Sequence, residues 1–347
     1  MPAVEAWAFG SNLFNQLDPD ENNNNNKKKK IANLLKHFPN NLIKSFHVLH
    51  LADSQTLVQY TTNEEPEQAC LEIWGFNEDA PMKHRQRVAD GALSHPLDQI
   101  QEWHGRTTIV GYLSRDGTLR PFAMSSHDEE KPAAPGINIP RYRTLTISDN
   151  GQVLAAPLDA SSSSHTHHSF QLWSSFHELL MPGAKPIRSF NLIASAGETE
   201  IQLSSGAAHF LILTHTPIAV DGEYHSSVYG FGDNRFGQIG IGTRSAWVEE
   251  PQKLETLEGT MRIDCGLLHS VAVGGDGTLY TFGDNRKGQC GVVDSNANTP
   301  LDTAAPVLVD LGGNGQAGTI IDVRDARCGS QHTAALAHNG LWLTGSS

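Results

Sequence analysis

Closely spaced imidazoles give this sequence its clearest candidate for metal chemistry. His165-Thr166-His167-His168 places three histidines within four residues, and imidazole nitrogens are common ligands of zinc. The tract lies among serines, with no neighbouring cysteine or carboxylate pair. A fixed metal site needs ligands on rigid elements, held by further hydrogen bonds. We therefore expect this segment to form a solvated loop without a bound metal.

Three other histidines, His209, His269 and His332, recur at one position of a repeated pattern. Catalytic machinery is usually built once, from different residues, whereas a side chain that returns in each repeat serves the scaffold. We expect these imidazoles to be structural, each forming a hydrogen bond to a neighbouring strand.

The cysteines form no Cys-x-x-Cys pair; they are Cys70, Cys265, Cys290 and Cys328. Cys265 and Cys328 occupy the same repeat position, which Ser205 fills in another copy. A small buried residue is therefore the expected role, rather than a metal ligand or half of a disulfide. Unpaired thiols are typical of reducing compartments, so we expect a cytoplasmic protein, a nuclear protein or both.

Two Asp-Asn pairs, Asp233-Asn234 and Asp284-Asn285, suggest calcium binding at first sight. Each stands in Asp-Asn-Arg-x-Gly, which lacks the alternating oxygen ligands that calcium loops need. Side chains of this type also cap turns. The sequence contains no Gly-x-x-x-x-Gly-Lys-Ser/Thr loop, no strand followed by Gly-x-Gly-x-x-Gly, and no Gly-x-Ser-x-Gly elbow. We expect no catalytic residue, no cofactor and no metal.

These residues belong to a pattern that the chain repeats. VYGFGDNRFGQIG, starting at Val228, returns as LYTFGDNRKGQCG, starting at Leu279, an offset of 51 residues. Both copies contain the strand-ending glycine, Gly232 or Gly283. Self-similarity at a fixed spacing of tens of residues indicates a repeat architecture.

Each repeat predicts β-sheet. A short apolar strand follows the repeated histidine, and a tight turn follows the strand, as at Asp276-Gly277, Asn339-Gly340 and Asn150-Gly151. Asp-Gly and Asn-Gly supply the positive φ angles of two-residue hairpins. A second strand with aromatic and β-branched residues comes next. Roughly four short strands in each ~50-residue repeat favour the radial sheets of a β-propeller.

The pattern Cys-Gly-x-x-His-Thr, Asp-Gly and Phe-Gly-x-Asn-x-x-Gly-Gln resembles the regulator of chromosome condensation repeat, most closely over residues 201–345. The resemblance implies an all-β propeller of six to seven four-stranded blades. In that family the last blade is closed by pairing the two chain ends, so we expect Trp7 to Gly10 to supply the closing strand. Seven strand ends of the expected kind are present, but only six strands of the His-Thr type, which leaves the blade number open between six and seven.

We expect residues 1–347 to form a single propeller domain with flexible insertions near 18–33, 125–140 and 159–169. The first contains an asparagine and lysine run, which cannot bury apolar surface.

Pro121 suits only an edge strand, and we expect a short helix at Phe176 to Met181. No apolar run approaches the ~18 residues of a membrane span.

Charge argues against direct nucleic-acid binding. The chain has 38 acidic and 25 basic side chains, for a net charge of −13, whereas nucleic-acid binders usually present a basic face.

Hydrophobic residues make up 38% of the chain, which is enough for a core. We expect a monomer or a heterodimer with a protein partner.

The resemblance implies three alternative functions. The first is a fungal adaptor, an α-tubulin suppressor, for a small zinc electron-donor protein of diphthamide synthesis and of Elongator-dependent tRNA modification. The second is a partner of a JmjC oxygenase in chromatin and spindle function. The third is a guanine nucleotide exchange factor for a Ran-type GTPase; this ranks last, because the insertion near 125–140 is acidic and no basic tail is recognisable.

All three alternatives describe a non-enzymatic protein-binding propeller. Loops on a rigid scaffold commonly carry recognition, so we expect the glycine-punctuated loops to contact the partner. The predicted contact residues are Asp233, Asn234, Arg235, Asp284, Asn285 and Arg286.

Overall fold

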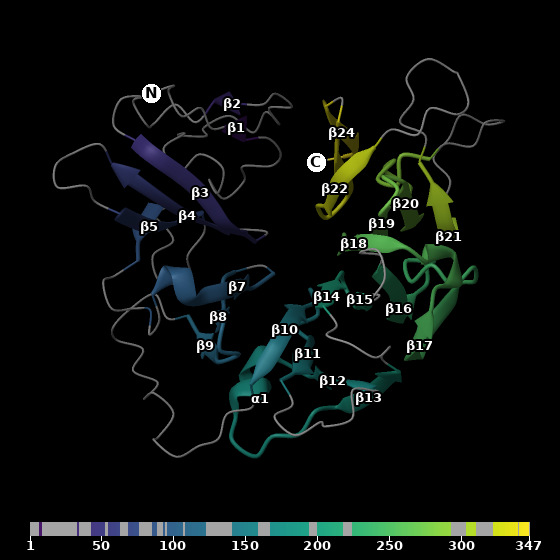
Figure 1. Ribbon diagram of the computed structural model, residues 1–347, viewed down its shortest axis with the longest axis horizontal. Coiled ribbons are helices and arrows are strands. Elements are labelled where there is room, and N and C mark those ends of the chain that lie inside the picture. Colours follow the sequence, from purple (N-terminus) through teal and green to yellow (C-terminus); the bar gives the residue numbers. More distant parts are fainter. Residues whose placement is uncertain are drawn as a thin grey trace. The chain divides into compact units, whose positions relative to one another are not determined.

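The computed structural model describes a chain built almost wholly from antiparallel β-strands (Figure 1). The residues it describes are 7–8, 33–34, 43–52, 55–62, 69–75, 85–88, 93, 96–106, 108–122, 141–158, 167–193, 200–217, 224–292, 303–309, 322–338 and 340–346. The chain divides into two compact units, Met1–Asn138 and Ile139–Ser347.

The first unit contains three sheets among its described residues. Two short strands, β1 (Trp7–Ala8) and β2 (Asn33–Leu34), form the first sheet. The second has four strands: β3 (Ile43–Leu51), β4 (Gln55–Thr62), β5 (Ala69–Gly75) and β6 (Arg85–Arg87). After the short 3-10 helix η1 (Leu97–Gln99), the third has three strands: β7 (Ile100–His104), β8 (Gly111–Ser114) and β9 (Leu119–Pro121).

The described residues of the second unit form four sheets in chain order. The first comprises β10 (Tyr142–Ile147), β11 (Val153–Pro157), β12 (His167–Trp173) and β13 (Arg188–Ile193), with the helix α1 (Phe176–Leu180) between the last two strands. The second comprises β14 (Glu200–Ser205), β15 (His209–Pro217), β16 (Tyr224–Asn234) and β17 (Ser245–Lys253). The third follows the 3-10 helix η2 (Glu255–Leu257) and comprises β18 (Thr260–Cys265), β19 (His269–Gly274), β20 (Leu279–Gly283) and β21 (Thr303–Leu308). The fourth comprises β22 (Val323–Cys328), β23 (His332–Ala337) and β24 (Gly340–Gly345).

Tight turns join consecutive strands where the sequence predicts them: Asp276-Gly277 joins β19 to β20, and Asn150-Gly151 joins β10 to β11. Gly277 has φ +80° and Gly151 has φ +86°, a region that a residue with a side chain rarely adopts. At the first of these turns, the Asp276 carboxylate accepts a hydrogen bond from the Thr278 backbone N–H at 3.1 Å. Local residue chemistry therefore sets the hairpin register.

Successive sheets of the second unit pack face to face through apolar side chains. Phe190 of β13 lies 5.0 Å, and Phe210 of β15 lies 5.1 Å, from the ring of Phe231 in β16, measured between centroids. The next interface buries Ile263 and Phe282 against strands β15 and β16. The first strands of neighbouring sheets also contact one another: β10 with β14, β14 with β18, and β18 with β22. Such stacking of four-stranded meanders is the packing expected of propeller blades.

The predicted all-β architecture of four-stranded antiparallel sheets is confirmed. Pro121 lies in β9 at the edge of its sheet, as predicted. The short helix is also confirmed, and the Ser175 hydroxyl caps it by accepting a hydrogen bond from the Glu178 N–H at 3.1 Å.

The structure differs from the predicted organisation at two places. Trp7, expected in the closing strand, pairs with Leu34 of β2 in the described residues, so closure of a ring by the N-terminal strand stays a prediction. His167, His168 and Ser169, which we assigned to a flexible insertion, begin β12 and pair with β13. Their backbone hydrogen bonds to β13 outweigh the loop tendency of the serine tract. The other residues of the three predicted insertions, apart from Asn33 in β2, lie outside the described residues.

Candidate functional site

The loop after β16 is built from buried polar side chains that hold its backbone. Asn234 and Gln238 have no exposed surface. The Asn234 side chain donates to the Thr243 carbonyl at 2.8 Å and accepts from the Ile239 N–H at 3.1 Å. The Gln238 amide oxygen accepts from the Phe236 N–H at 2.9 Å. These bonds satisfy loop backbone groups that no sheet ladder serves.

The loop after β20 repeats the same arrangement. Asn285 accepts from the Cys290 N–H at 2.8 Å and donates to the Val292 carbonyl, while Gln289 accepts from the Lys287 N–H at 2.9 Å. Both Asn285 and Gln289 are buried. The repeated Asn and Gln of the sequence motif are therefore internal braces of two equivalent loops.

The aspartate and arginine of each loop form a forked ion pair. Arg235 donates from Nε to Asp233 Oδ1 at 2.9 Å and from Nη2 to Oδ2 at 2.7 Å. Arg286 donates to Asp284 Oδ1 at 2.8 Å and to Oδ2 at 3.0 Å. Such two-point pairs fix the plane of the guanidinium as well as its position.

Within each pair the aspartate is buried and the arginine is exposed. The side chains of Asp233 and Asp284 are 4% and 6% exposed, against 65% and 60% for Arg235 and Arg286. Burial by itself would raise the pKa of each carboxyl, but hydrogen bonds from the arginine outweigh it, so the pKa of both Asp233 and Asp284 lies below its ordinary value. Both carboxylates are therefore ionised near neutral pH and neither serves as an acid there.

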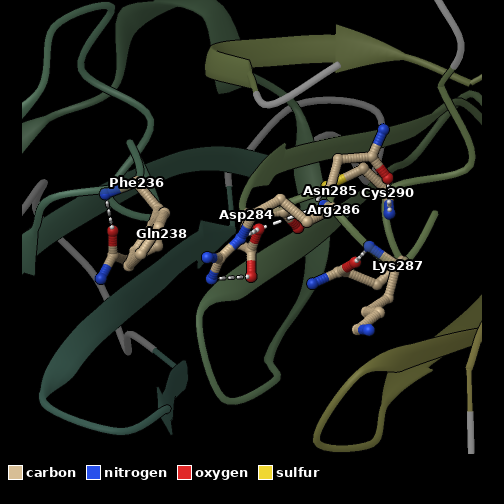
Figure 2. A network of polar contacts seen from close by, with 8 residues as sticks. Phe236, Gln238, Asp284, Asn285, Arg286, Lys287 and Cys290 are labelled. Atoms are coloured by element: carbon tan, nitrogen blue, oxygen red, sulfur yellow. Dashed lines mark hydrogen bonds and ion pairs between the residues drawn. The ribbon is translucent and has the colours of Figure 1, made fainter. Parts of the chain in front are cut away.

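The two loops meet at their tips. The Arg286 guanidinium lies over the Phe236 ring, 4.6 Å from its centroid, in a cation–π contact. Figure 2 shows the Phe236 ring beside the Asp284–Arg286 pair, together with Lys287, the residue that follows Arg286. Phe236 is half-buried and Lys287 is exposed. We call the surface formed by Arg235, Phe236, Arg286 and Lys287 the cationic rim.

The structure favours only two of the six predicted partner-contact residues. Asp233, Asn234, Asp284 and Asn285 are buried and hold their loops, so direct contact between these four side chains and a partner is disfavoured. The physical reason is that their oxygens are the nearest acceptors for the loop N–H groups and for the arginines. Arg235 and Arg286 remain predicted contact residues.

The repeated histidines join neighbouring sheets. His209 Nε2 lies 3.0 Å from the Ser270 hydroxyl, and that hydroxyl donates to the Gln238 carbonyl at 2.8 Å. His269 Nε2 is likewise 3.0 Å from Thr333, whose hydroxyl donates to the Gln289 carbonyl at 2.8 Å. Because each hydroxyl hydrogen is already used, each hydroxyl oxygen accepts, which assigns the proton of both imidazoles to Nε2.

These histidine–hydroxyl–carbonyl hydrogen bonds connect the repeated histidines, which we call the histidine row, to the loops. Gln238 and Gln289 lie in the two loops that carry the cationic rim, so the carbonyl of each is held by a hydroxyl from the next sheet. His209 and His269 are fully buried, whereas His332 is half-buried and burial lowers its pKa. His209 and His269 therefore make the expected hydrogen bond to a neighbouring strand, whereas that bond stays a prediction for His332.

Sequence reasoning missed a fourth member of the row. Gln55 pairs with Gly75 across β4 and β5, just as His209 pairs with Gly232 and His332 with Gly345. The Gln55 side chain accepts from the Ile109 N–H of the next sheet at 2.9 Å. Sequence spacing does not reveal it, because 20 residues separate Gln55 from Gly75 whereas 14 separate His269 from Gly283, and glutamine also breaks the histidine pattern.

The strand-ending glycines are required by close backbone contacts. Gly232 has φ +101° and Gly283 has φ +108°. A Cβ atom at Gly232 would lie 2.4 Å from the Ala208 carbonyl oxygen, and one at Gly283 would lie 2.6 Å from that of Leu268. Glycine therefore allows β16 and β20 to end directly against the turn before the histidine.

The cysteines are free thiols in the described part of the chain. Cys265 and Cys328 pair with Ser270 and Thr333 at the same place in their sheets where Ser205 pairs with Phe210. Cys265 is 1% exposed. Burial raises the pKa of the Cys328 thiol, with a further contribution from Asp264, so this thiol is not a nucleophile at neutral pH.

Candidate metal ligands do not come together in the described residues. His165 and Thr166 lie outside these residues, while His167 and His168 belong to β12. Among the described side chains, no group of three histidines, cysteines or carboxylates is placed to hold a metal ion. Over the same ranges, the structure contains no helix long and apolar enough to cross a membrane.

Comparison with known protein families identifies the repeat. Residues 225–273 and 276–336 match the regulator of chromosome condensation (RCC1) repeat, and residues 262–289 match a second description of that repeat. The resemblance drawn from the sequence is confirmed, and this part of the chain carries RCC1 repeats.

Curated relatives share only part of their length with this chain. The human X-linked retinitis pigmentosa GTPase regulator is 33% identical over 107 residues, which cover 30% of this chain and 10% of that protein. The human probable E3 ubiquitin-protein ligase HERC6 is 29% identical over 203 residues, which cover 57% of this chain and 16% of that protein. This chain therefore corresponds to a small part of these relatives.

A solved structure supports the propeller fold. Prp20p from Saccharomyces cerevisiae, described with its binding properties to Gsp1p and histones, superposes with a TM-score of 0.59 at 16% identity. The match covers 98% of this chain and 78% of that structure. At this identity the likeness concerns the fold alone, which is an RCC1-type β-propeller.

Proposed function

We propose that this chain is a non-catalytic protein-binding propeller that acts as an adaptor or regulatory subunit, and that its partner contacts the cationic rim. The observation that carries the proposal is the repeated forked pair. Each loop buries an aspartate and uses it to hold an exposed arginine in one orientation.

Rigid display of arginine favours binding. A free arginine side chain loses rotamer entropy when a partner immobilises it, at a cost of about 0.5–1.5 kcal/mol. Arg235 and Arg286 are already held by two hydrogen bonds each. Arginine is also enriched among interface residues that dominate affinity.

The proton chemistry of the described site supports a non-catalytic role. The loop carboxylates are ionised and paired, and the imidazoles of His209 and His269 are committed to hydroxyl groups of the next sheet. A general acid or base needs a pKa near the working pH and access to a substrate. The lowered pKa of the two carboxyls opposes the first requirement. The burial of all four side chains opposes the second.

The partner that we place first is a small zinc electron-donor protein of diphthamide synthesis and Elongator-dependent tRNA modification, because the sequence resembles that adaptor. A JmjC oxygenase and a Ran-type GTPase are the other candidates. Prp20p is described with Gsp1p and histones, and its likeness to this chain is the observation that keeps the GTPase under test.

Affinity capture of the tagged full chain, followed by mass spectrometry, tests this proposal. Wild type is compared with the Arg235→Ala/Arg286→Ala double variant and with Arg188→Ala. Arg188 is the control, because it is a partly exposed arginine that pairs with Glu249 of β17 and not with a carboxylate of the two loops. We expect one specific partner that the double variant loses and the control keeps. Equal capture by all three proteins would refute the rim as the contact surface.

A further inference from the structure

We infer that the cationic rim binds an acidic segment of the partner protein through carboxylate groups. This inference rests on the proposed function and adds the chemical class of the ligand. Its starting point is the sign of the charge that the two loop tips present.

The rim is positive although the chain is strongly negative. In the described loops 233–242 and 284–292, the exposed charged side chains are those of Arg235, Arg286 and Lys287. The aspartates of the same loops are ionised and buried beneath the guanidinium groups, so these loops hold three positive and two negative side chains, a net charge of +1. The whole chain has a net charge of −13. A cationic surface on such a chain favours an anionic ligand at that place.

The Arg235–Asp233 pair leaves capacity for a second carboxylate. A guanidinium carries five N–H groups in one plane, and the bonds from Arg235 to Asp233 engage the Nε and Nη2 nitrogens. Nη1 belongs to the same rigid plane, so an incoming carboxylate can be bound without release of Asp233. Lys287 adds a point charge beside Arg286, which suits a ligand with several carboxylates along a chain.

Phe236 joins the two loops through its contact with Arg286. Its half-buried ring supports the Arg286 guanidinium at 4.6 Å, and its neighbour in the chain is Arg235. The two arginines therefore belong to one surface and can contact successive acidic residues of one extended segment. Exposed aromatic surface beside cations also favours a peptide over a simple inorganic anion.

An acidic peptide fits this rim better than a nucleic acid does. Nucleic-acid affinity comes from many phosphate contacts along a duplex or a strand. Three cations supply few such contacts, and the remaining negative charge of the protein repels an extended polyanion. A short segment with a few carboxylates escapes most of that repulsion.

Fluorescence anisotropy with a labelled octaglutamate peptide tests the inference on the full chain. We expect octaglutamate to bind at about 20 mM salt and to weaken as salt rises toward about 150 mM, because exposed charges are screened. Arg235→Ala/Arg286→Ala should bind about tenfold more weakly or worse, and Lys287→Ala should show a smaller loss. Arg188→Ala should match wild type. Urea unfolding of each variant checks that the fold is retained.

Three results would overturn the inference: no octaglutamate binding at low salt, equal binding by the double arginine variant, or tighter binding of an oligothymidylate of equal length. The first two exclude the acidic ligand, and the third assigns the rim to nucleic acid. A partner that needs both arginines, yet is not displaced by octaglutamate, would refute this inference and leave the proposed function standing. A partner captured equally by the double variant would refute the proposed function itself.

Discussion

Removal of one repeated imidazole should destabilise the protein by an amount that follows from its surroundings. His269 is fully buried and donates from Nε2 to the Thr333 hydroxyl at 3.0 Å. The His269→Ala substitution deletes that bond, at a cost of about 1 kcal/mol. It also leaves a cavity over Gly266, where the ring now packs, at a further cost of about 2 kcal/mol. We expect the free energy of unfolding to fall by about 3 kcal/mol.

Two matched substitutions separate the hydrogen bond from the packing. Gln55 occupies the equivalent position in another sheet and bonds to the Ile109 N–H, so His269→Gln should recover about half of the loss by donating to Thr333. His332→Ala removes a half-buried ring and should cost about half as much as His269→Ala.

Urea unfolding followed by far-ultraviolet circular dichroism measures these differences. The midpoint should decrease in the order wild type, His269→Gln, His269→Ala, with an unchanged denaturant slope. An alanine variant as stable as wild type would refute the structural role of the row. A glutamine variant no better than alanine would refute the assigned hydrogen bond.

Three further outcomes are expected. Gly283→Ala should destabilise the protein by more than about 2 kcal/mol, because φ is +108° and the new Cβ would lie 2.6 Å from the Leu268 carbonyl oxygen. Gly151→Ala should cost about 1 kcal/mol, because its Cβ meets no atom within 4 Å. Equal midpoints of the two variants in thermal unfolding would contradict this. Burial, with a contribution from His50, lowers the pKa of His104 from 6.5 to about 3, so the unfolded chain binds this proton first and stability should fall by about 1.4 kcal/mol per pH unit as pH falls below 6.5. His104→Gln should flatten that part of the urea profile, and an unchanged slope would show that the imidazole does not titrate in this way. The purified chain should not accelerate the release of labelled GDP from a Ran-type GTPase; acceleration would favour the exchange-factor function.

The repeated half of the fold could be predicted because its local signals agree. The echo between Val228 and Leu279, the Asp276-Gly277 turn and the strand-ending glycines all indicate the same meander, and the structure has it. The first unit is harder, because β6 is the polar Arg85–Arg87 and because Gln55 replaces the repeated histidine. The pairing of Trp7 with Leu34 spans a polar low-complexity run, and no local pattern encodes it.

At the candidate site, the sequence alone does not predict which polar side chains are exposed. Asp233 and Asn234 are polar residues in a glycine-rich loop, and the sequence cannot tell whether such side chains face a partner or the loop backbone. Burial decides the question, because the loop N–H groups need acceptors that the sheet does not supply. Arg235, the residue after Asn234, is exposed although it pairs with the buried Asp233.

Hydrogen exchange of the full chain, alone and saturated with the partner obtained by affinity capture, tests the central claim most directly. The account predicts slower amide exchange on binding at the loop residues 235–240 and 286–291, since these backbones lie at the cationic rim. The edge strand β17, residues 245–253, should exchange at an unchanged rate. Protection of β17 with no change in either loop would contradict the account.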